Sequence, residues 1–319
     1  MSAKANQTTV EAGRLRHVLS SGVSYIGTSM NCLTGSKPDY AHAIKMYDIG
    51  IAKVRNVIND LDQTLKSHEL KSLEHVMVIE ENFRKENHLV FEWTQKFSRY
   101  VQESRIFSDI EAVSEMSKSK ALAVGALWHS FSTFMPKFLC QACVMVTSNE
   151  KRHYVIQTAF EELGMRNSRE IHADMFWDAA KITGLTENMA ARLRESSEVK
   201  DALNFLENTL LNYRSDEEVL GVLLGLEIPA IENIETIFQS LAHNDEVKTN
   251  LNQHMFFRLH REIEIEHVRL TVTNFLRFCP QKAEQDRFLI GFHDGLKFWQ
   301  MFWNATAETC RALESETVC

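Results

Sequence analysis

Three residues of types that bind metal ions lie within one short segment of the chain. His260, Glu264 and His267 occur in LNQHMFFRLHREIEIEHVRLTVTNFLRFC, residues 251–279. On a helix with about 100° per residue, their side chains fall within about 60° of one another. Steps of four and three residues place ligands one turn apart on one helix face, which suits metal chelation. The segment therefore predicts one wall of a metal site.

The same three residues fall on the apolar side of the predicted helix. Arg258 and Arg269 lie on the opposite, charged side, as expected of a solvated face. Unpaired polar groups on a buried face are strongly unfavourable, so the three residues must have partners. They either bind a metal or form a hydrogen-bonded polar network in the core. Glu264 lies between the two histidines and could serve two ions, one with each histidine.

A second candidate pair, Glu162 and His172, is separated by nine residues. On an unbroken helix this spacing places the two side chains about 15 Å apart, too far for one small site. Gly164 and the polar residues 166–168 predict a helix break that would bring the pair together. Spacing does not choose between Glu162 and its neighbour Glu161. The alternative is a capping glutamate and a histidine of the core.

A further candidate ligand, Glu227, ends the apolar run VLGVLLGLEIP, residues 219–229. A carboxylate near a helix C-terminus is disfavoured by the helix dipole, so Glu227 needs a cation nearby. Gly221 and Gly225 lie on one helix face and would let a neighbouring helix approach closely. The alternative for Glu227 is an exposed position at a helix end.

Helices must position these residues, because the sequence predicts an all-α protein. Only 12 glycines and 4 prolines occur in 319 residues, which favours long helices over a many-stranded β fold. Residues 1–106 are expected to form an N-terminal helical hairpin, which either covers the core domain or makes a homodimer contact. Residues 107–319 are expected to form the core domain. Hydrophobic periodicity predicts helices at 40–67, 70–103, 109–118, 119–146, 150–164, 168–182, 187–195, 199–212, 215–227, 230–242, 245–279 and 282–312.

Composition argues against several classes of protein. The net charge of −8 is spread without a basic run, so a nucleic-acid partner is not expected. No apolar stretch approaches the roughly 18 residues of a membrane span. The N-terminus lacks the apolar segment of a signal peptide, so we expect a cytoplasmic protein. The six cysteines are expected to be free thiols, with Cys140 and Cys143 as small core residues rather than a zinc or redox site.

Taken together, these motifs resemble the heme-oxygenase-like diiron oxidases and oxygenases, relatives of the PQQ-synthesis and thiaminase-II-like folds. The resemblance covers roughly residues 107–310. It rests on the E-x9-H element of Glu162 and His172, on Glu227, and on the H-x3-[DE]-x2-H element of residues 260–267. The phrases EELG and GFHDGLKFWQMFW also fit this family. The resemblance implies a heme-oxygenase-like helical bundle with an N-terminal extension.

The resemblance also implies a ligand set and an activity. Two Fe(2+) ions per chain would activate O2, with electrons from an external donor. The substrate would be a small amine or amino acid, undergoing N-oxygenation, C–C cleavage or oxidative rearrangement. The family's three carboxylates and three histidines map onto Glu162, His172, Glu227, His260, Glu264 and His267.

The sequence departs from the family pattern at two places. Glu264 stands where aspartate is common. Many members also carry a glutamate on the first core helix, whereas residues 116–149 contain none. His129 is the nearest residue of a ligand type on that helix, and it is a candidate replacement.

Three other interpretations remain open. A metal-free, thiaminase-II-like enzyme would need Cys140, Cys143 or Cys279 as its nucleophile. A non-catalytic helical interaction protein would use the candidate ligands only for stability. A heme protein would need a proximal histidine near the start of the fold, and the carboxylates would then have no purpose.

Overall fold

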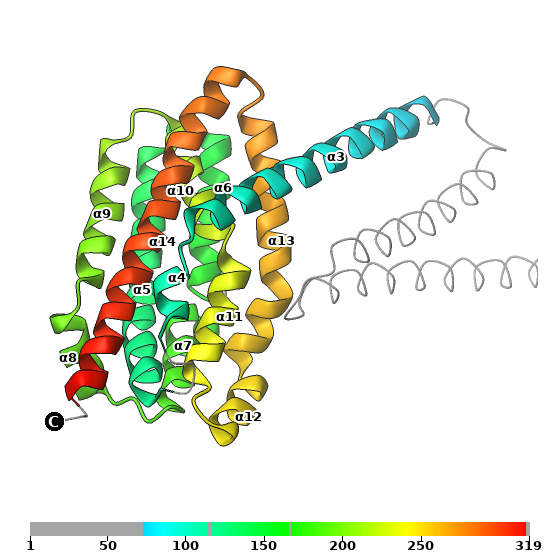
Figure 1. Ribbon diagram of the computed structural model, residues 1–319. Coiled ribbons are helices and arrows are strands. Elements are labelled where there is room, and N and C mark those ends of the chain that lie inside the picture. Colours follow the sequence, from blue (N-terminus) through cyan, green and yellow to red (C-terminus); the bar gives the residue numbers. More distant parts are fainter. Residues whose placement is uncertain (1–72, 114–116, 166, 317–319) are drawn as a thin grey trace, which may run out of the picture. The chain divides into compact units, whose positions relative to one another are not determined.

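The computed structural model describes residues 73–113, 117–165 and 167–316, and every regular element in these ranges is helical (Figure 1). For residues 73–87, 196, 262–266 and 316, only the backbone is described. The all-α prediction is therefore confirmed. The chain divides into two compact units, residues 1–85 and 86–319. The N-terminal hairpin predicted over 1–106 lies largely outside the described residues, and its last part, 86–106, belongs to the second unit.

The helices follow one another with short connections. The elements are α3 (Leu73–Ser104), α4 (Ser108–Glu111), α5 (Lys118–Met145), α6 (Asn149–Glu162), η1 (Ser168–Glu170), α7 (His172–Lys181), α8 (Glu187–Ser196), α9 (Val199–Asn212), α10 (Asp216–Glu227), α11 (Ala230–Leu241), α12 (Asp245–Gln253), α13 (Met255–Phe278) and α14 (Lys282–Glu316).

Three predicted helices are wrong in extent. The helix expected over 168–182 is the short 3-10 helix η1 followed by α7, with the extended Ile171 between them. The single helix expected over 245–279 is two helices, because the chain is extended at His254, whose side chain accepts a hydrogen bond from the Phe256 amide at 3.2 Å and caps α13. The helix expected over 109–118 is only the short α4, and α5 begins at Lys118 with Ser117 as its N-cap.

Helices α10 and α14 are in backbone contact through glycines. A Cβ atom added to Gly221 would lie 2.0 Å from the Phe288 carbonyl oxygen, and one added to Gly291 would lie 1.9 Å from that of Glu218. Gly225 faces Gly295 one turn further along. Close helix packing at Gly221 and Gly225 is thus confirmed. It holds the C-terminal end of α10, which carries Glu227, at a fixed place against α14.

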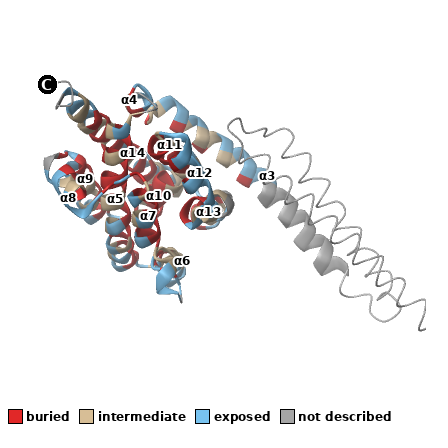
Figure 2. Cartoon of the chain, turned by 90° about the horizontal axis from the view of Figure 1, so that it is seen from below, coloured by how far each residue is buried: buried red, intermediate tan, exposed pale blue. Residues whose placement is uncertain are grey.

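A stack of tryptophans lies in the core between α5 and α14. The Trp128 ring lies 5.4 Å from that of Trp299 and 5.9 Å from that of Trp303. Trp299 Nε1 donates to the Leu226 carbonyl at 3.2 Å, and Trp303 Nε1 donates to Asn233 Oδ1 at 2.9 Å. Residues coloured as buried lie mainly on the inward faces of the helices (Figure 2). The stack therefore fixes the end of α10 and the start of α11 from the core side.

The part of α3 that belongs to the second unit packs on the same core. Trp93 lies 4.6 Å from the Phe275 ring of α13, and the fully buried Phe97 lies 4.8 Å from the Phe292 ring of α14. Contacts of this kind between aromatic rings add to the hydrophobic stabilisation of burial. This segment of α3 therefore covers one side of the α13–α14 contact.

The start of α10 is tied to the connection between α5 and α6. Asp216 accepts hydrogen bonds from the backbone amides of Thr147 at 2.8 Å and Ser148 at 3.0 Å. Burial alone would raise the pKa of Asp216, but these hydrogen bonds and the charge of Lys151 lower that pKa overall. The ionised carboxylate therefore stabilises the junction from which both α6 and α10 run toward the candidate site.

We expect Asp216→Asn to lower the free energy of unfolding at pH 7 by about 2 kcal/mol, because a charged acceptor of two amides is lost. The contribution of Asp216 is present above its unfolded pKa of about 3.9 and is lost as pH falls through the lower, folded value. Urea unfolding between pH 3 and 7 measures this effect. Asp201→Asn, at an exposed position in the first turn of α9, is the control. Equal losses of unfolding free energy in Asp216→Asn and Asp201→Asn would contradict the stabilising role of Asp216.

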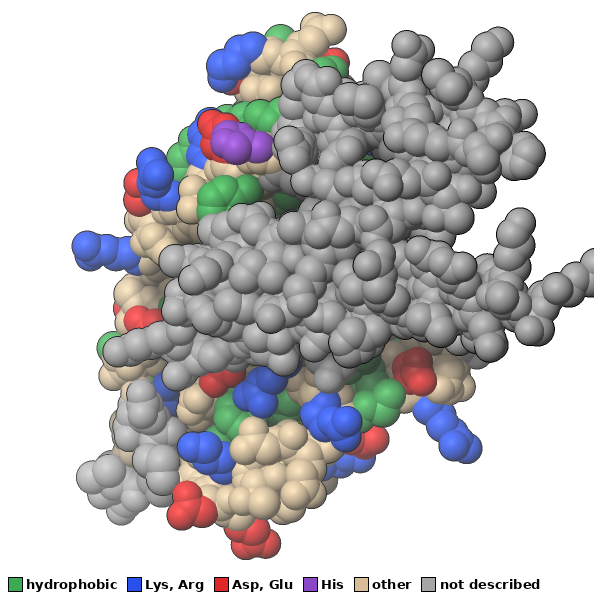
Figure 3. Space-filling model, turned by 90° about the vertical axis from the view of Figure 1, so that its right-hand side faces the viewer, with side chains coloured by type: hydrophobic (Ala, Val, Ile, Leu, Met, Phe, Trp, Pro, Cys, Tyr) green, Lys and Arg blue, Asp and Glu red, His purple; other side chains and the backbone are tan. Residues whose placement is uncertain are grey.

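Cys143 is buried as predicted, but Cys140 is exposed, so a core position is wrong for this cysteine. No helix within the described ranges has the length and apolar character needed to cross a bilayer. Acidic and basic side chains are interspersed over the described part of the face shown in Figure 3.

Candidate metal centre

A sharp turn separates the two candidate ligands Glu162 and His172. Helix α6 ends at Glu162, and Gly164 adopts a left-handed conformation with φ of 75°. The Met165 amide donates to the Phe160 carbonyl, and the Gly164 amide donates to that of Glu161, both at 2.9 Å. These two bonds form the Schellman motif, in which glycine is favoured because it lacks a Cβ atom. The helix break predicted at Gly164 is confirmed.

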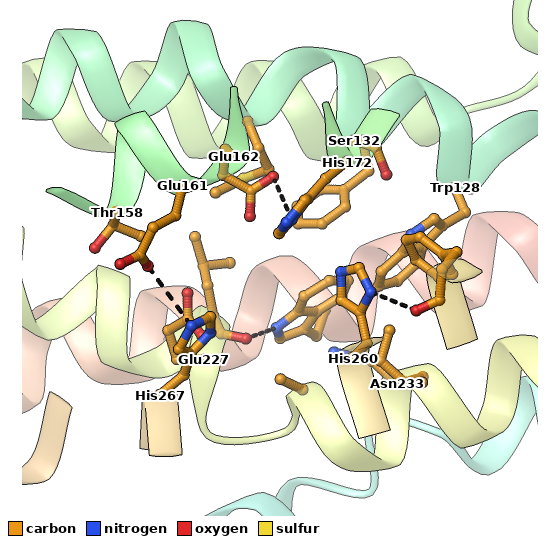
Figure 4. A pocket seen from close by; sticks show the side chains of 17 residues that line it. Trp128, Ser132, Thr158, Glu161, Glu162, His172, Glu227, Asn233, His260 and His267 are labelled. Carbon is orange, nitrogen blue, oxygen red and sulfur yellow. Dashed lines mark hydrogen bonds and ion pairs between the residues drawn. The ribbon is translucent and has the colours of Figure 1, made fainter. Parts of the chain in front are cut away.

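The two adjacent glutamates at the end of α6 pair with different histidines. Glu162 Oε2 lies 3.3 Å from Nδ1 of His172, the first residue of α7. Glu161 Oε2 lies 3.6 Å from Nε2 of His267 on α13. Figure 4 shows that both pairs line one pocket. The structure thus brings Glu161 to the site as well as Glu162, a result that spacing in the sequence could not decide.

Helix α13 presents His260 and His267 to the same pocket. His260 is 5% exposed, and its ring lies 4.7 Å from that of His172. Its Nδ1 lies 2.7 Å from the Phe256 carbonyl oxygen. Because a carbonyl can only accept, Nδ1 carries a proton, and Nε2 is therefore the ring nitrogen with which His260 could bind a metal. Glu264 lies on the same helix, but its side chain is outside the described ones.

Glu227 is the last residue of α10, as predicted. Pro229 lacks an amide hydrogen and cannot continue the helix, so the chain turns here into α11. The Trp299 indole donates a hydrogen bond to the carbonyl of Leu226, the residue before Glu227. The position of Glu227 is therefore set from two sides, by the chain turn and by the tryptophan stack.

These side chains line one pocket of about 80 Å³. Since a single water needs only roughly 10–15 Å³ of such volume, the pocket has room for metal ions and a few waters. Among the described side chains, no three donors already stand at the spacing of a metal site. The rest of the wall is mainly apolar. The lining residues are Trp128, Phe131, Ser132, Met135, Thr158, Glu161, Glu162, His172, Leu226, Glu227, Ala230, Asn233, Ile234, Phe256, His260, His267 and Trp299.

The electrostatics of the pocket favour a cation. Glu161 and Glu162 lie at the C-terminal end of α6, and Glu227 lies at that of α10, so all three carboxylates face the negative ends of helix dipoles. None of the lining residues is lysine or arginine. Burial alone would raise the pKa of Glu162, but the hydrogen bond with His172 and the charges of His172, His260 and His267 lower it overall. Glu162 is therefore held ionised.

The donor set suits iron. Carboxylate oxygen and imidazole nitrogen together are the ligands of non-heme iron sites, and no cysteine lines the pocket to favour a thiolate-bound metal. Asn233 adds a further polar group. Its Oδ1 accepts from Trp303, which fixes the amide, and its buried Nδ2 has no hydrogen-bond partner. This orphaned donor lies in the pocket wall, where it would be satisfied by an oxygen atom bound inside.

His129 does not lie at the pocket. Its ring lies 4.8 Å from that of Trp177, and burial lowers its pKa. The residues of α5 that line the pocket are Trp128, Phe131, Ser132 and Met135. His129 therefore does not replace the glutamate missing from α5.

Comparison with known proteins agrees with this fold. Two crystal structures of a CADD-like protein of unknown function from Nostoc punctiforme match with 18% and 17% identity, each with a TM-score of 0.51. The matches cover 70% and 72% of this chain and 98% of the Nostoc chain. At this identity the likeness shows the fold alone, a heme-oxygenase-like helical bundle. No curated protein matches the sequence.

A family model described as iron-containing redox enzyme matches residues 134–300, slightly more than half of the chain. The matched region begins within α5 and ends within α14. It therefore includes every residue of the carboxylate–histidine pocket except those at the start of its α5 wall. The chain belongs to the family of iron-containing redox enzymes.

Proposed function

We propose that this protein is a non-heme diiron enzyme that uses O2 to oxidise a small amine or amino acid. The observation that carries the proposal is the convergence of three carboxylates and three histidines in one pocket without a lysine or arginine. The resemblance supports N-oxygenation, C–C cleavage or oxidative rearrangement as the reaction, with electrons from an external donor.

The proposed ligands of the two Fe(2+) ions are those implied by the resemblance, together with Glu161. Glu161 lines the pocket and lies beside His267, so it can supply the carboxylate that α5 does not. We assign it as the substitute for the glutamate that many relatives carry on the first core helix. The other proposed ligands are Glu162, His172, Glu227, His260, Glu264 and His267.

The chain's own residues prepare the pocket for this chemistry. Bound iron would pass electrons from the external donor to O2, which is the chemistry that the protein side chains cannot supply. Glu162 is held ionised, and the Nδ1 of His260 donates to the Phe256 carbonyl, so a metal would bind this ring at Nε2. Trp128, Phe256 and Trp299 form part of an apolar wall that limits the entry of water. The Trp303 indole fixes the side chain of Asn233, which lines the pocket and has a buried Nδ2 without a hydrogen-bond partner.

The thiol required by a metal-free, thiaminase-II-like mechanism is not found at the pocket. Cys140, Cys143 and Cys279 are all absent from its lining. Burial raises the pKa of Cys279 to about 12, which leaves almost no thiolate at neutral pH. The geometry of the described residues therefore favours the metal-dependent proposal over the thiol-dependent one.

Anaerobic titration with Fe(II) tests the proposal. We expect two ions to bind per chain, and we expect the affinity for iron to fall at least about tenfold in His260→Ala and in Glu162→Ala, because each loses a ligand. Iron is measured by colorimetric assay, and folding is verified by circular dichroism. Glu195→Gln, at an exposed position on α8, is the control. A parent protein that binds no iron, or unchanged iron in both ligand variants, would refute the proposal.

A further inference from the structure

The pocket of the proposed metal site shares part of its wall with a larger cavity. This cavity lies between α6 and α13 and has a volume of about 420 Å³. Its wall includes Thr158, Glu161, Glu227 and His267, which also line the 80 Å³ pocket. Small-molecule sites are typically about 300–1,000 Å³. The smaller pocket therefore fits ions and waters, whereas the larger cavity fits an organic molecule.

The cavity is elongated along the two helices. Helices α6 and α13 run antiparallel here, because Glu161 lies near His267, Tyr154 near Thr271 and Glu150 near Arg277. The ten residues from His267 to Arg277 span about 15 Å along α13. One end of the cavity thus borders the metal pocket, and the other end lies at the Glu150–Arg277 ion pair.

Most of the residues between these ends carry a polar group on their side chain. The Thr271 hydroxyl donates to the His267 carbonyl at 2.7 Å, so the Tyr154 hydroxyl, 2.7 Å from Thr271, must donate to it. Burial raises the pKa of Tyr154, which keeps it neutral. Leu270 and Phe278 are the apolar parts of the wall. A purely apolar chain would leave the polar groups of this wall unsatisfied. These polar side chains are His153, Tyr154, Gln157, Thr158, Thr271 and Asn274.

The outer end of the cavity carries one charge of each sign. The side chains of Glu150 and Arg277 are 58% and 62% exposed and form an ion pair with each other. An ion pair this exposed contributes little to stability, so a bound molecule can replace it at little cost. The charges required of that molecule are a carboxylate for Arg277 and an ammonium group for Glu150.

We infer that this cavity is the substrate site and that it binds a free α-amino acid by its head group. The carboxylate contacts Arg277, the ammonium group contacts Glu150, and the side chain points inward, toward Glu161 and His267. The inference deepens the proposed function and rests on it only in identifying the bound molecule as the substrate. It also implies that oxidation occurs on the side chain, far from the α-carbon.

Binding of the twenty proteinogenic L-amino acids to the full-length protein tests the inference, with and without Fe(II). Isothermal titration calorimetry should detect at least one of them. We expect its α-amide, which lacks the carboxylate, and its N-acetyl derivative, which lacks the ammonium charge, to bind at least about tenfold more weakly. Arg277→Gln should weaken binding of the amino acid to a similar extent.

Two further variants test the location. Asn274→Trp places a large ring in the cavity and should abolish binding. Arg258→Gln, at an exposed arginine of α13 that lines neither cavity, is the matched control and should bind as the parent does. If none of the twenty binds, or if Arg277→Gln and Asn274→Trp bind as tightly as Arg258→Gln, the inference is wrong.

The orientation is measured by proton relaxation of the bound amino acid in the Fe(II)-loaded protein. Paramagnetic relaxation should be strongest at the end of the side chain and weakest at the α-proton. The reverse gradient would overturn the inferred orientation. If the protein binds no iron but still binds the amino acid in an Arg277-dependent way, the proposed function fails and the binding site remains.

Discussion

Gly291→Ala is expected to lower the free energy of unfolding by about 3 kcal/mol or more. The added Cβ atom would lie 1.9 Å from the Glu218 carbonyl oxygen, well inside the 3.4 Å at which ordinary contact begins. The obstacle is backbone, which cannot rotate aside as a side chain can. Helices α10 and α14 must therefore separate, and the close backbone packing between them is lost. The expected change in melting temperature is a fall of roughly 6–12 °C for a unit of this size.

Gly125→Ala is the matched control for this prediction. Gly125 is also buried in a helix interior, but a Cβ atom there would meet only side-chain atoms, of Leu185 at 3.2 Å and Ala180 at 3.3 Å. Alanine also favours the helix over glycine by about 1 kcal/mol, which offsets the crowding. The melting temperatures of Gly291→Ala and Gly125→Ala, measured by thermal unfolding, test this prediction. A Gly291→Ala protein as stable as Gly125→Ala would show that α10 and α14 are not in backbone contact.

Glu161→Gln is expected to lower bound iron from two ions to about one per chain. The glutamine amide is a far weaker ligand than the glutamate carboxylate. Helix α5 contributes no carboxylate to the pocket that could take its place. Loss of one ion should slow oxygen consumption by the Fe(II)-loaded protein by about 100-fold or more. An oxygen electrode and an iron assay on the same preparation give both values.

Glu195→Gln on α8 again serves as the control, since it replaces an exposed glutamate by the same amide. Glu161→Asp separates the role of the charge from the role of the side-chain length and should retain more iron than Glu161→Gln. Two ions bound by Glu161→Gln with unchanged affinity would remove Glu161 from the ligand set and leave the remainder of the proposal standing.

Much of the site follows from local sequence physics. Helical periodicity places His260 and His267 on the apolar face of α13, and the structure has both in the pocket. Gly164 marks the end of α6 because it favours the left-handed conformation found there. Glu227 ends an apolar helix before Pro229, and both features are visible in the chain. Each of these predictions needs only the conformational preferences of a few neighbouring residues.

What could not be predicted depends on contacts between distant segments. Glu161 and Glu162 differ by about 100° around α6, so only the positions of α7 and α13 decide which histidine each one meets. The break at His254 has no glycine or proline to mark it, and histidine is not among the preferred N-caps. Asn233 has no signal in the sequence, because its role comes from the Trp303 indole that orients it.

The tryptophan stack gives the protein an intrinsic optical reporter. Trp128 and Trp299 lie in the wall of the metal pocket and in the core stack at the same time. Their ultraviolet emission therefore originates beside the proposed iron ligands, where a bound paramagnetic ion would quench it. Occupancy of the pocket can thus be followed by the fluorescence of the native chain, without any added dye or label.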